Sequence, residues 1–194
     1  MKILHLAVDE KFIDMGVNSF ERVWPGCNEV LVYSNSNKLK VKYCNAFKVS
    51  FIDLFNPKYI NKIRNADVLV LHSLLPIFYP ILLFSKKETP LVWIGWGRDY
   101  YDYLCKESEL TLPVTKRKIK SLKGERNTIN KIREFFFLLM KSSLLKRITH
   151  FAPVLKEEYR GELTKYKYLD WNYGTIEKDF VPNKNIKISG NKFY

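Results

Sequence analysis

Residues 67–72 read DVLVLH, and this run is the clearest strand in the sequence. Its four central residues are leucine and valine, a pattern typical of a strand that is buried on both faces of a parallel sheet. Similar short apolar runs occur before and after it, at residues 3–8 and 91–95. Helical patterns separate these runs, so the sequence predicts right-handed βαβ units and an α/β fold.

The remaining elements are predicted to alternate in the same way. One apolar stripe with helical spacing runs from Ile13 to Trp24 and is ended by Pro25. We expect strands at residues 3–8, 29–33, 46–51, 67–72, 91–95, 149–154 and 166–171. We expect helices at residues 13–24, 57–65, 76–84, 128–147 and 155–163.

The composition fits one folded domain or a domain with part of another. The chain has 194 residues, of which 46% are hydrophobic. Cys27, Cys44 and Cys105 show no paired spacing, which argues against a disulfide framework and favours a reducing, cytoplasmic compartment. The N-terminus has no signal-peptide pattern, and the apolar runs are too short to cross a bilayer. Any contact with a membrane is therefore expected to be peripheral.

The positive charge calls for an anionic partner. The net charge is +13, and residues 106–148 hold 12 Lys and Arg against 4 Asp and Glu. We expect residues 106–126 to be a basic linker without periodicity, followed by a helix rich in Phe and Leu. This combination indicates a segment that faces an anionic membrane surface; its proposed contacts are Lys116, Arg117, Lys118 and Lys120.

Two alternatives to the membrane-facing segment remain open. The segment also fits an ordinary solvated basic loop next to a core helix. Nucleic acid is a less favoured partner, because no recognition motif accompanies the charge.

The sequence predicts a domain boundary near residue 175. Residues 1–175 form the α/β domain, and residues 176–185 are polar and contain Pro182, as an interdomain linker would. The following IKISGN run, residues 186–191, reads as a strand that enters a turn. We interpret residues 176–194 as a linker and the first strand of a truncated second domain. The alternative is a frayed tail.

The candidate binding residues follow the predicted strands. Ligands of an open parallel sheet bind at the carboxyl ends of its strands. These ends supply Asp9 and Glu10, then His72, and then the run from Gly95 to Asp99. The alternatives are structural, because Asp9 and Glu10 suit the start of a helix and His72 suits a core position.

The run after the fifth predicted strand is the most informative. The Trp96 indole offers a flat apolar face to a sugar or a prenyl chain, and Gly97 allows close backbone approach. Arg98 can pair with a phosphate, and Asp99 can accept hydrogen bonds from sugar hydroxyls. Alternatively, Trp96 packs in the core and Asp99 caps the next helix.

Several common classes of site have no motif here. The sequence contains no Gly-x-Gly-x-x-Gly, P-loop, His-Glu-x-x-His or Cys-x-x-Cys pattern. This disfavours classical dinucleotide binding, P-loop ATPase activity and zinc chemistry. We expect neither a cofactor nor a metal.

Four local patterns resemble the TDP-N-acetylfucosamine:lipid II N-acetylfucosaminyltransferase family, also called the 4-alpha-L-fucosyltransferase family. The first strand with His5 and the later Phe20 is similar to the family's opening, and His72 ends a strand as in the family. Most specific is the W-x-x-W-G-x-D-x-Y pattern at residues 93–101. Residues 188–191 are similar to the start of the family's second domain.

The resemblance implies the N-terminal half of a GT-B fold, in which two Rossmann-like domains face each other across a cleft. This half would bind a polyprenyl-diphosphate-linked saccharide as acceptor. The missing half would bind the nucleotide-sugar donor, such as TDP-N-acetylfucosamine, without a metal. The expected function is sugar transfer in surface polysaccharide (O-antigen) assembly at the cytoplasmic face of the membrane. The rival hypotheses are an inactive truncated remnant, a module that binds anionic lipids or glycans, and a nucleic-acid-binding protein.

Overall fold

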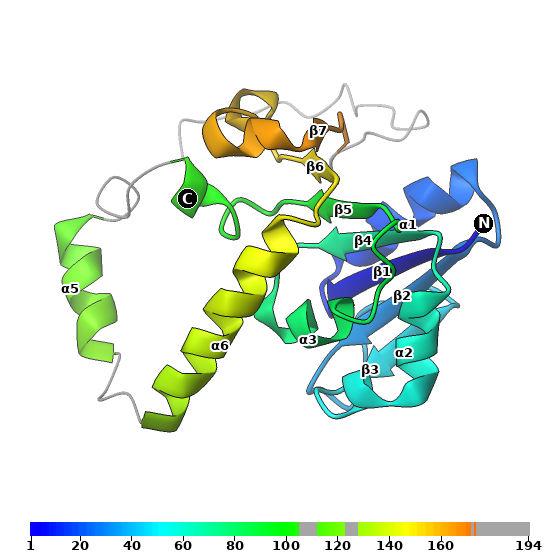
Figure 1. Ribbon diagram of the computed structural model, residues 1–194, viewed down its shortest axis with the longest axis horizontal. Coiled ribbons are helices and arrows are strands. Elements are labelled where there is room, and N and C mark those ends of the chain that lie inside the picture. Colours follow the sequence, from blue (N-terminus) through cyan, green and yellow to red (C-terminus); the bar gives the residue numbers. More distant parts are fainter. Residues whose placement is uncertain (105–111, 123–127, 172, 174–194) are drawn as a thin grey trace, which may run out of the picture.

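The computed structural model describes residues 1–104, 112–122, 128–171 and 173. These residues contain a seven-stranded, entirely parallel sheet with helices on both faces (Figure 1). The strands are β1 (Ile3–Val8), β2 (Asn28–Tyr33), β3 (Ala46–Val49), β4 (Val68–His72), β5 (Leu91–Ile94), β6 (His150–Ala152) and β7 (Lys167–Tyr168). The predicted α/β parallel sheet with flanking helices is confirmed, and the fold is Rossmann-like.

The strand order locates the point where ligands are expected. The order is β3-β2-β1-β4-β5-β6-β7, so the chain winds outward in one direction from β1 and in the other from β4. In a doubly wound sheet the crevice lies outside the carboxyl ends of the two strands at which the order reverses. Here these strands are β1 and β4.

The two sheet faces are covered by different helices. Leucines such as Leu6 and Leu71 share one buried cluster with residues of α2, α3 and α6, while Val30 and Val32 pack with α1 on the other face. Figure 1 shows α1 on the opposite side of the sheet from α2 and α3. Burial on both faces explains why the strands read as continuous apolar runs.

The helices begin and end where local chemistry allows. The helices are α1 (Phe12–Val23), α2 (Pro57–Arg64), α3 (Tyr79–Leu82), α5 (Pro113–Leu122) and α6 (Thr128–Leu145). Short 3₁₀ segments are η1 (Asp53–Phe55), η2 (Pro76–Phe78), η3 (Tyr101–Tyr103), η4 (Lys156–Glu158) and η5 (Gly161–Lys165). Helix α2 illustrates the local logic, because the Asn56 side chain accepts a 2.9 Å hydrogen bond from the Lys58 backbone N–H and Pro57 opens the helix.

The expected linker at residues 106–126 is wrong in part, because it contains helix α5. Pro113 suits the first turn, and lysine and arginine are good helix formers. Leu112 and Val114 are 75% and 71% exposed, so the apolar side chains at the start of the helix are not buried in a core. Figure 1 shows α5 well away from the sheet. The described side chains of α5 are exposed, so they form no apolar stripe that faces a core.

Two predicted helices are shorter or tighter than expected. Residues 155–163 form the 3₁₀ segment η4 and the start of η5. The two are separated by Tyr159 and the extended Arg160, and Gly161, which opens η5, has a positive φ of 59°. Residues 76–84 begin as η2 and continue as the short helix α3, with Pro80 in its first turn. Prolines and this left-handed glycine interrupt helical hydrogen bonding in both places.

Other expectations fall outside the described residues. They are the linker and strand at residues 176–194 and the expectation that Cys105 belongs to no disulfide framework. Cys27 and Cys44 are free cysteines. Within the described residues, no helix combines the length and the apolarity that a membrane crossing requires.

Candidate functional site

The carboxyl ends of β1, β4 and β5 hold most of the residues predicted as ligand contacts. Asp9 and Glu10 follow β1, His72 ends β4, and the turn containing Trp96 and Asp99 follows β5. Because β1 and β4 flank the reversal of strand order, this edge is the candidate site. The contacts of each residue decide what it can do there.

The Asp99 carboxylate joins the turns that follow β4 and β5. Its Oδ2 accepts hydrogen bonds from the Trp93 indole N–H at 2.6 Å and the Leu74 backbone N–H at 2.8 Å. Its Oδ1 accepts a 2.8 Å bond from the Trp96 backbone N–H. The N-cap of η3 is Tyr100, so Asp99 does not cap that segment. Asp99 acts as a positioning residue for both turns.

The glycines of the β5 turn are required by neighbouring tyrosines. Gly97 has a φ of 84°, and a Cβ there would lie 2.9 Å from the Tyr101 ring. A Cβ on Gly95 would lie 2.4 Å from the ring of Tyr100, which is fully buried. The close approach expected at Gly97 is therefore made by a side chain of the same chain.

Trp96 and Arg98 differ in exposure within this turn. The Trp96 indole is partly buried and packs edge-to-face on Tyr173, with ring centroids 5.8 Å apart. The Trp96 Nε1 is buried and has no well-formed hydrogen bond among the described residues. It lies close to the Tyr173 hydroxyl and partly offsets the increase that burial causes in the pKa of Tyr173. Arg98 is exposed.

His72 belongs to a buried chain of hydrogen bonds across β4, β1 and β2. Its Nε2 lies 2.9 Å from Nδ1 of His5, and its Nδ1 is bonded to the Tyr173 hydroxyl. Nε2 of His5 lies 3.2 Å from Oδ1 of Asn28. Both imidazoles are fully buried. His72 is therefore a buried residue with both ring nitrogens hydrogen-bonded, as the structural interpretation describes.

The partners of Asn28 fix the direction of every bond in the chain. Its Nδ2 donates to Glu21 at 2.6 Å and to a backbone carbonyl at 3.0 Å, so its Oδ1 faces His5 as an acceptor. His5 must then carry a proton on Nε2 and accept at Nδ1 from His72 Nε2–H. The Tyr173 hydroxyl consequently donates to His72 Nδ1.

Burial keeps both histidines of this chain neutral. It lowers the pKa of His5 to about 4 and holds the pKa of His72 well below its ordinary value. Burial also raises the pKa of Tyr173. Sequence reasoning singled out His72 but assigned no role in the site to Asn28, Glu21 or Tyr173. The one local signal was His5, a polar residue inside an apolar strand.

Asp9 and Glu10 bind the loop that follows β2. The Asp9 carboxylate accepts bonds from the backbone N–H groups of Lys40 at 2.7 Å and Val41 at 3.1 Å, and from the Ser34 hydroxyl at 3.3 Å. Glu10 is partly exposed and forms an ion pair with Lys40 at 3.7 Å. The N-cap of α1 is Lys11, with no side-chain hydrogen bond, so capping by Asp9 is not observed.

The predicted membrane-facing residues lie on α5. Arg117 and Lys118 are exposed, whereas the side chains of Lys116 and Lys120 lie outside the described part of the structure. Large apolar side chains are also exposed on this part of the molecule; they are Leu112, Val114, Phe136 and Leu139. We refer to α5 and α6 together, residues 112–122 and 128–145, as the limb.

Comparison with known proteins finds no relative for this chain. No family model, no curated protein and no solved structure matches it. In the part of the chain that the structure describes, no group of three or more His, Cys, Asp or Glu residues could hold a metal ion. The functional interpretation therefore rests on the residues of the carboxyl edge and of the limb.

Proposed function

We propose that this chain is the acceptor-side domain of a glycosyltransferase. The reaction would move a sugar from a nucleotide sugar, such as TDP-N-acetylfucosamine, to a polyprenyl-diphosphate-linked saccharide in surface polysaccharide assembly. The observation that carries the proposal is the position of the W-x-x-W-G-x-D-x-Y run. It spans the end of β5 and the turn that follows, at the carboxyl edge of a Rossmann-like sheet and beside the strand-order reversal.

The chemistry of that turn supports a glycan diphosphate as ligand. Arg98 is exposed and can donate two parallel hydrogen bonds to a phosphate. The Trp96 indole can pack on the C–H face of a sugar ring. Asp99, whose carboxylate already accepts three bonds, would hold both residues in place.

The limb supports a location at the surface of a membrane. Exposed Leu112 and Val114 lie at the start of a helix that also exposes Arg117 and Lys118. Apolar side chains beside basic ones favour the interface of an anionic bilayer, where each near-surface basic residue contributes ~1 kcal/mol. A polyprenyl anchor would be reached from the same surface.

A second candidate function is a non-catalytic module that binds anionic lipids or glycans. It is favoured by the hydrogen bonds of His72 and Asp99, because both ring nitrogens of His72 and both carboxylate oxygens of Asp99 are engaged within the chain. Neither side chain is then available as a general base in this state. An inactive remnant of a transferase would have the same properties.

A binding measurement separates these functions. The chain is titrated with a short-chain polyprenyl-diphosphate-linked N-acetylglucosamine, with the matching monophosphate, and with the polyprenyl alcohol, using tryptophan fluorescence. The transferase proposal expects the diphosphate saccharide to bind most tightly, and Arg98→Ala to weaken it by about tenfold. Equal binding of all three compounds, or no effect of Arg98→Ala, would contradict it. Lys156→Ala is a control, because that lysine is exposed and lies outside the β5 turn.

A further inference from the structure

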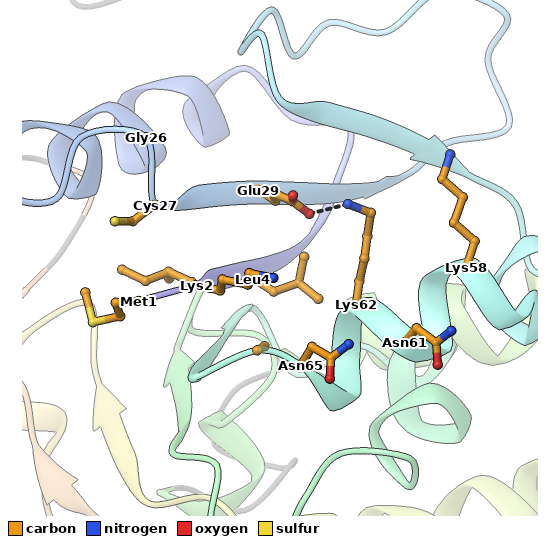
Figure 2. A pocket seen from close by; sticks show the side chains of 12 residues that line it. Met1, Lys2, Leu4, Gly26, Cys27, Glu29, Lys58, Asn61, Lys62 and Asn65 are labelled. Carbon is orange, nitrogen blue, oxygen red and sulfur yellow. Dashed lines mark hydrogen bonds and ion pairs between the residues drawn. The ribbon is translucent and has the colours of Figure 1, made fainter.

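A concave surface lies at the amino edge of the sheet. A cavity of about 260 Å³ opens between the first residues of β1, those of β2 and helix α2 (Figure 2). The candidate site follows the opposite, carboxyl ends of the same strands, and β1 alone is six residues long, or about 20 Å. The cavity is therefore separate from the carboxyl-edge site.

The charges that line the cavity favour an anion. Lys2, Lys58 and Lys62 contribute three positive charges, and Glu29 contributes the one carboxylate of the lining. A concave wall of low dielectric constant concentrates such an excess of positive potential. A cation or a neutral apolar ligand would not use this arrangement.

Lys62 is held in a fixed position at the cavity wall. Figure 2 shows its side chain extending from α2 to Glu29 on β2, where the two form an ion pair. Its Nζ also lies 4.4 Å from the ring centroid of Phe47, and the side chain is 22% exposed. The pair with Glu29 uses one of the three N–H donors of the ammonium group. The Lys58 ammonium lies 5.6 Å from the same ring, so both cations flank Phe47.

The rest of the lining suits a small polar body. Asn61 and Asn65 lie on the same face of α2 as Lys58 and Lys62, and their amides can both donate and accept hydrogen bonds. Buried Leu4 contributes an apolar side chain. The cavity volume of about 260 Å³ has room for a small phosphorylated polyol.

We propose that the amino-edge cavity binds a small phosphate monoester, with its phosphate at Lys58 and Lys62 and its hydroxyl groups at Asn61 and Asn65. The proposal is independent of sugar transfer at the carboxyl edge. It assigns a ligand to a surface that the glycosyltransferase proposal does not use.

The first test is a titration followed by ¹H–¹⁵N NMR. The probes are glycerol 3-phosphate, inorganic phosphate and glycerol, each added to the whole chain. We expect glycerol 3-phosphate to shift the amide signals at the starts of β1 and β2 and along α2, to bind about fivefold more tightly than inorganic phosphate, and to lose affinity as salt rises. Glycerol is expected to cause no shifts. Tighter binding of inorganic phosphate would overturn the assignment of a monoester, and shifts confined to other surfaces would overturn the site.

Two substitutions with opposite expected signs make the test specific. Lys62→Met removes a phosphate contact and should weaken glycerol 3-phosphate binding about fivefold. Glu29→Gln removes the opposing carboxylate and should tighten glycerol 3-phosphate binding severalfold. A general loss of folding could only weaken binding, so it cannot produce this result. Lys87→Met is the matched control, since Lys87 is an exposed lysine before β5 that does not line the cavity. Unchanged affinity in Glu29→Gln, or an equal loss in Lys87→Met, would refute the proposal.

Discussion

Replacing Asp99 by asparagine keeps the size of the side chain but removes one of its two acceptor oxygens. The carboxylate accepts three bonds, from the Trp93 indole, the Leu74 backbone and the Trp96 backbone. An amide can satisfy the two donors at Oδ2 or the one at Oδ1, and its NH₂ group would face the other side. The Trp93 side chain is fully buried, so water cannot replace a bond lost there.

The magnitude follows from those contacts. A hydrogen bond to a charged group contributes ~1.5–3 kcal/mol, and a buried donor left without an acceptor costs ~1–3 kcal/mol. Asparagine keeps part of the network, so we expect Asp99→Asn to lower the free energy of unfolding by about 2–3 kcal/mol. An N-cap aspartate would behave differently, because asparagine caps a helix as well as aspartate does.

Urea denaturation followed by circular dichroism measures this loss directly. Asp102→Asn is the control, since Asp102 is an exposed aspartate three residues later; it should change the unfolding free energy by less than about 0.5 kcal/mol. If Asp99→Asn is as stable as Asp102→Asn, the carboxylate does not hold the two turns together, and the assignment of Asp99 as a positioning residue is wrong.

Three further predictions concern the buried histidines, the β5 turn and the limb. The pKa of His5 is about 4 in the folded chain and 6.5 when unfolded, so the unfolded state gains its proton first as pH falls. Protonation of His5 should therefore lower the free energy of unfolding by about 2 kcal/mol between pH 7 and pH 5. A flat profile of urea midpoints over this range would contradict the burial of His5. Gly26→Ala and Gly97→Ala both place a side chain at positive φ, but only Gly97 lacks space, so its substitution should cost about 1 kcal/mol more in the same denaturation assay. Equal losses would show that the Tyr101 ring moves aside freely. Charge reversal at Arg117 and Lys118 should weaken binding to phosphatidylglycerol vesicles, measured by sedimentation, by more than ~2 kcal/mol in total. Unchanged binding would mean that α5 is only a solvated helix.

Local patterns were sufficient to predict the sheet. The strand at residues 67–72 was recognisable because its apolar run has no polar face, and that follows from helices covering both sides of the sheet. Helix α5 was missed because its described side chains are exposed, and helical periodicity is visible only where a face is buried. The segment at residues 155–163 was taken for one helix because Gly161 alone gives little sign of a left-handed break.

The site was predictable in location but not in contacts. Strand ends gave the positions of Asp9, His72 and Asp99, since topology places them at one edge. The hydrogen bonds that engage them come from distant residues: Tyr173 is 101 positions from His72, and Lys40 is 31 from Asp9. No spacing rule in a single sequence reports contacts of that range.

Sugar transfer to a lipid-linked diphosphate is measured directly by a transfer assay. The protein expressed from its whole gene is incubated with radiolabelled TDP-N-acetylfucosamine, and in parallel with other labelled nucleotide sugars, in the presence of a polyprenyl-diphosphate-linked saccharide. We expect a labelled lipid product whose amount falls about tenfold in Arg98→Ala, while the unfolding midpoint stays unchanged. No labelled lipid from any nucleotide sugar, or full transfer by Arg98→Ala, would contradict the proposed sugar transfer.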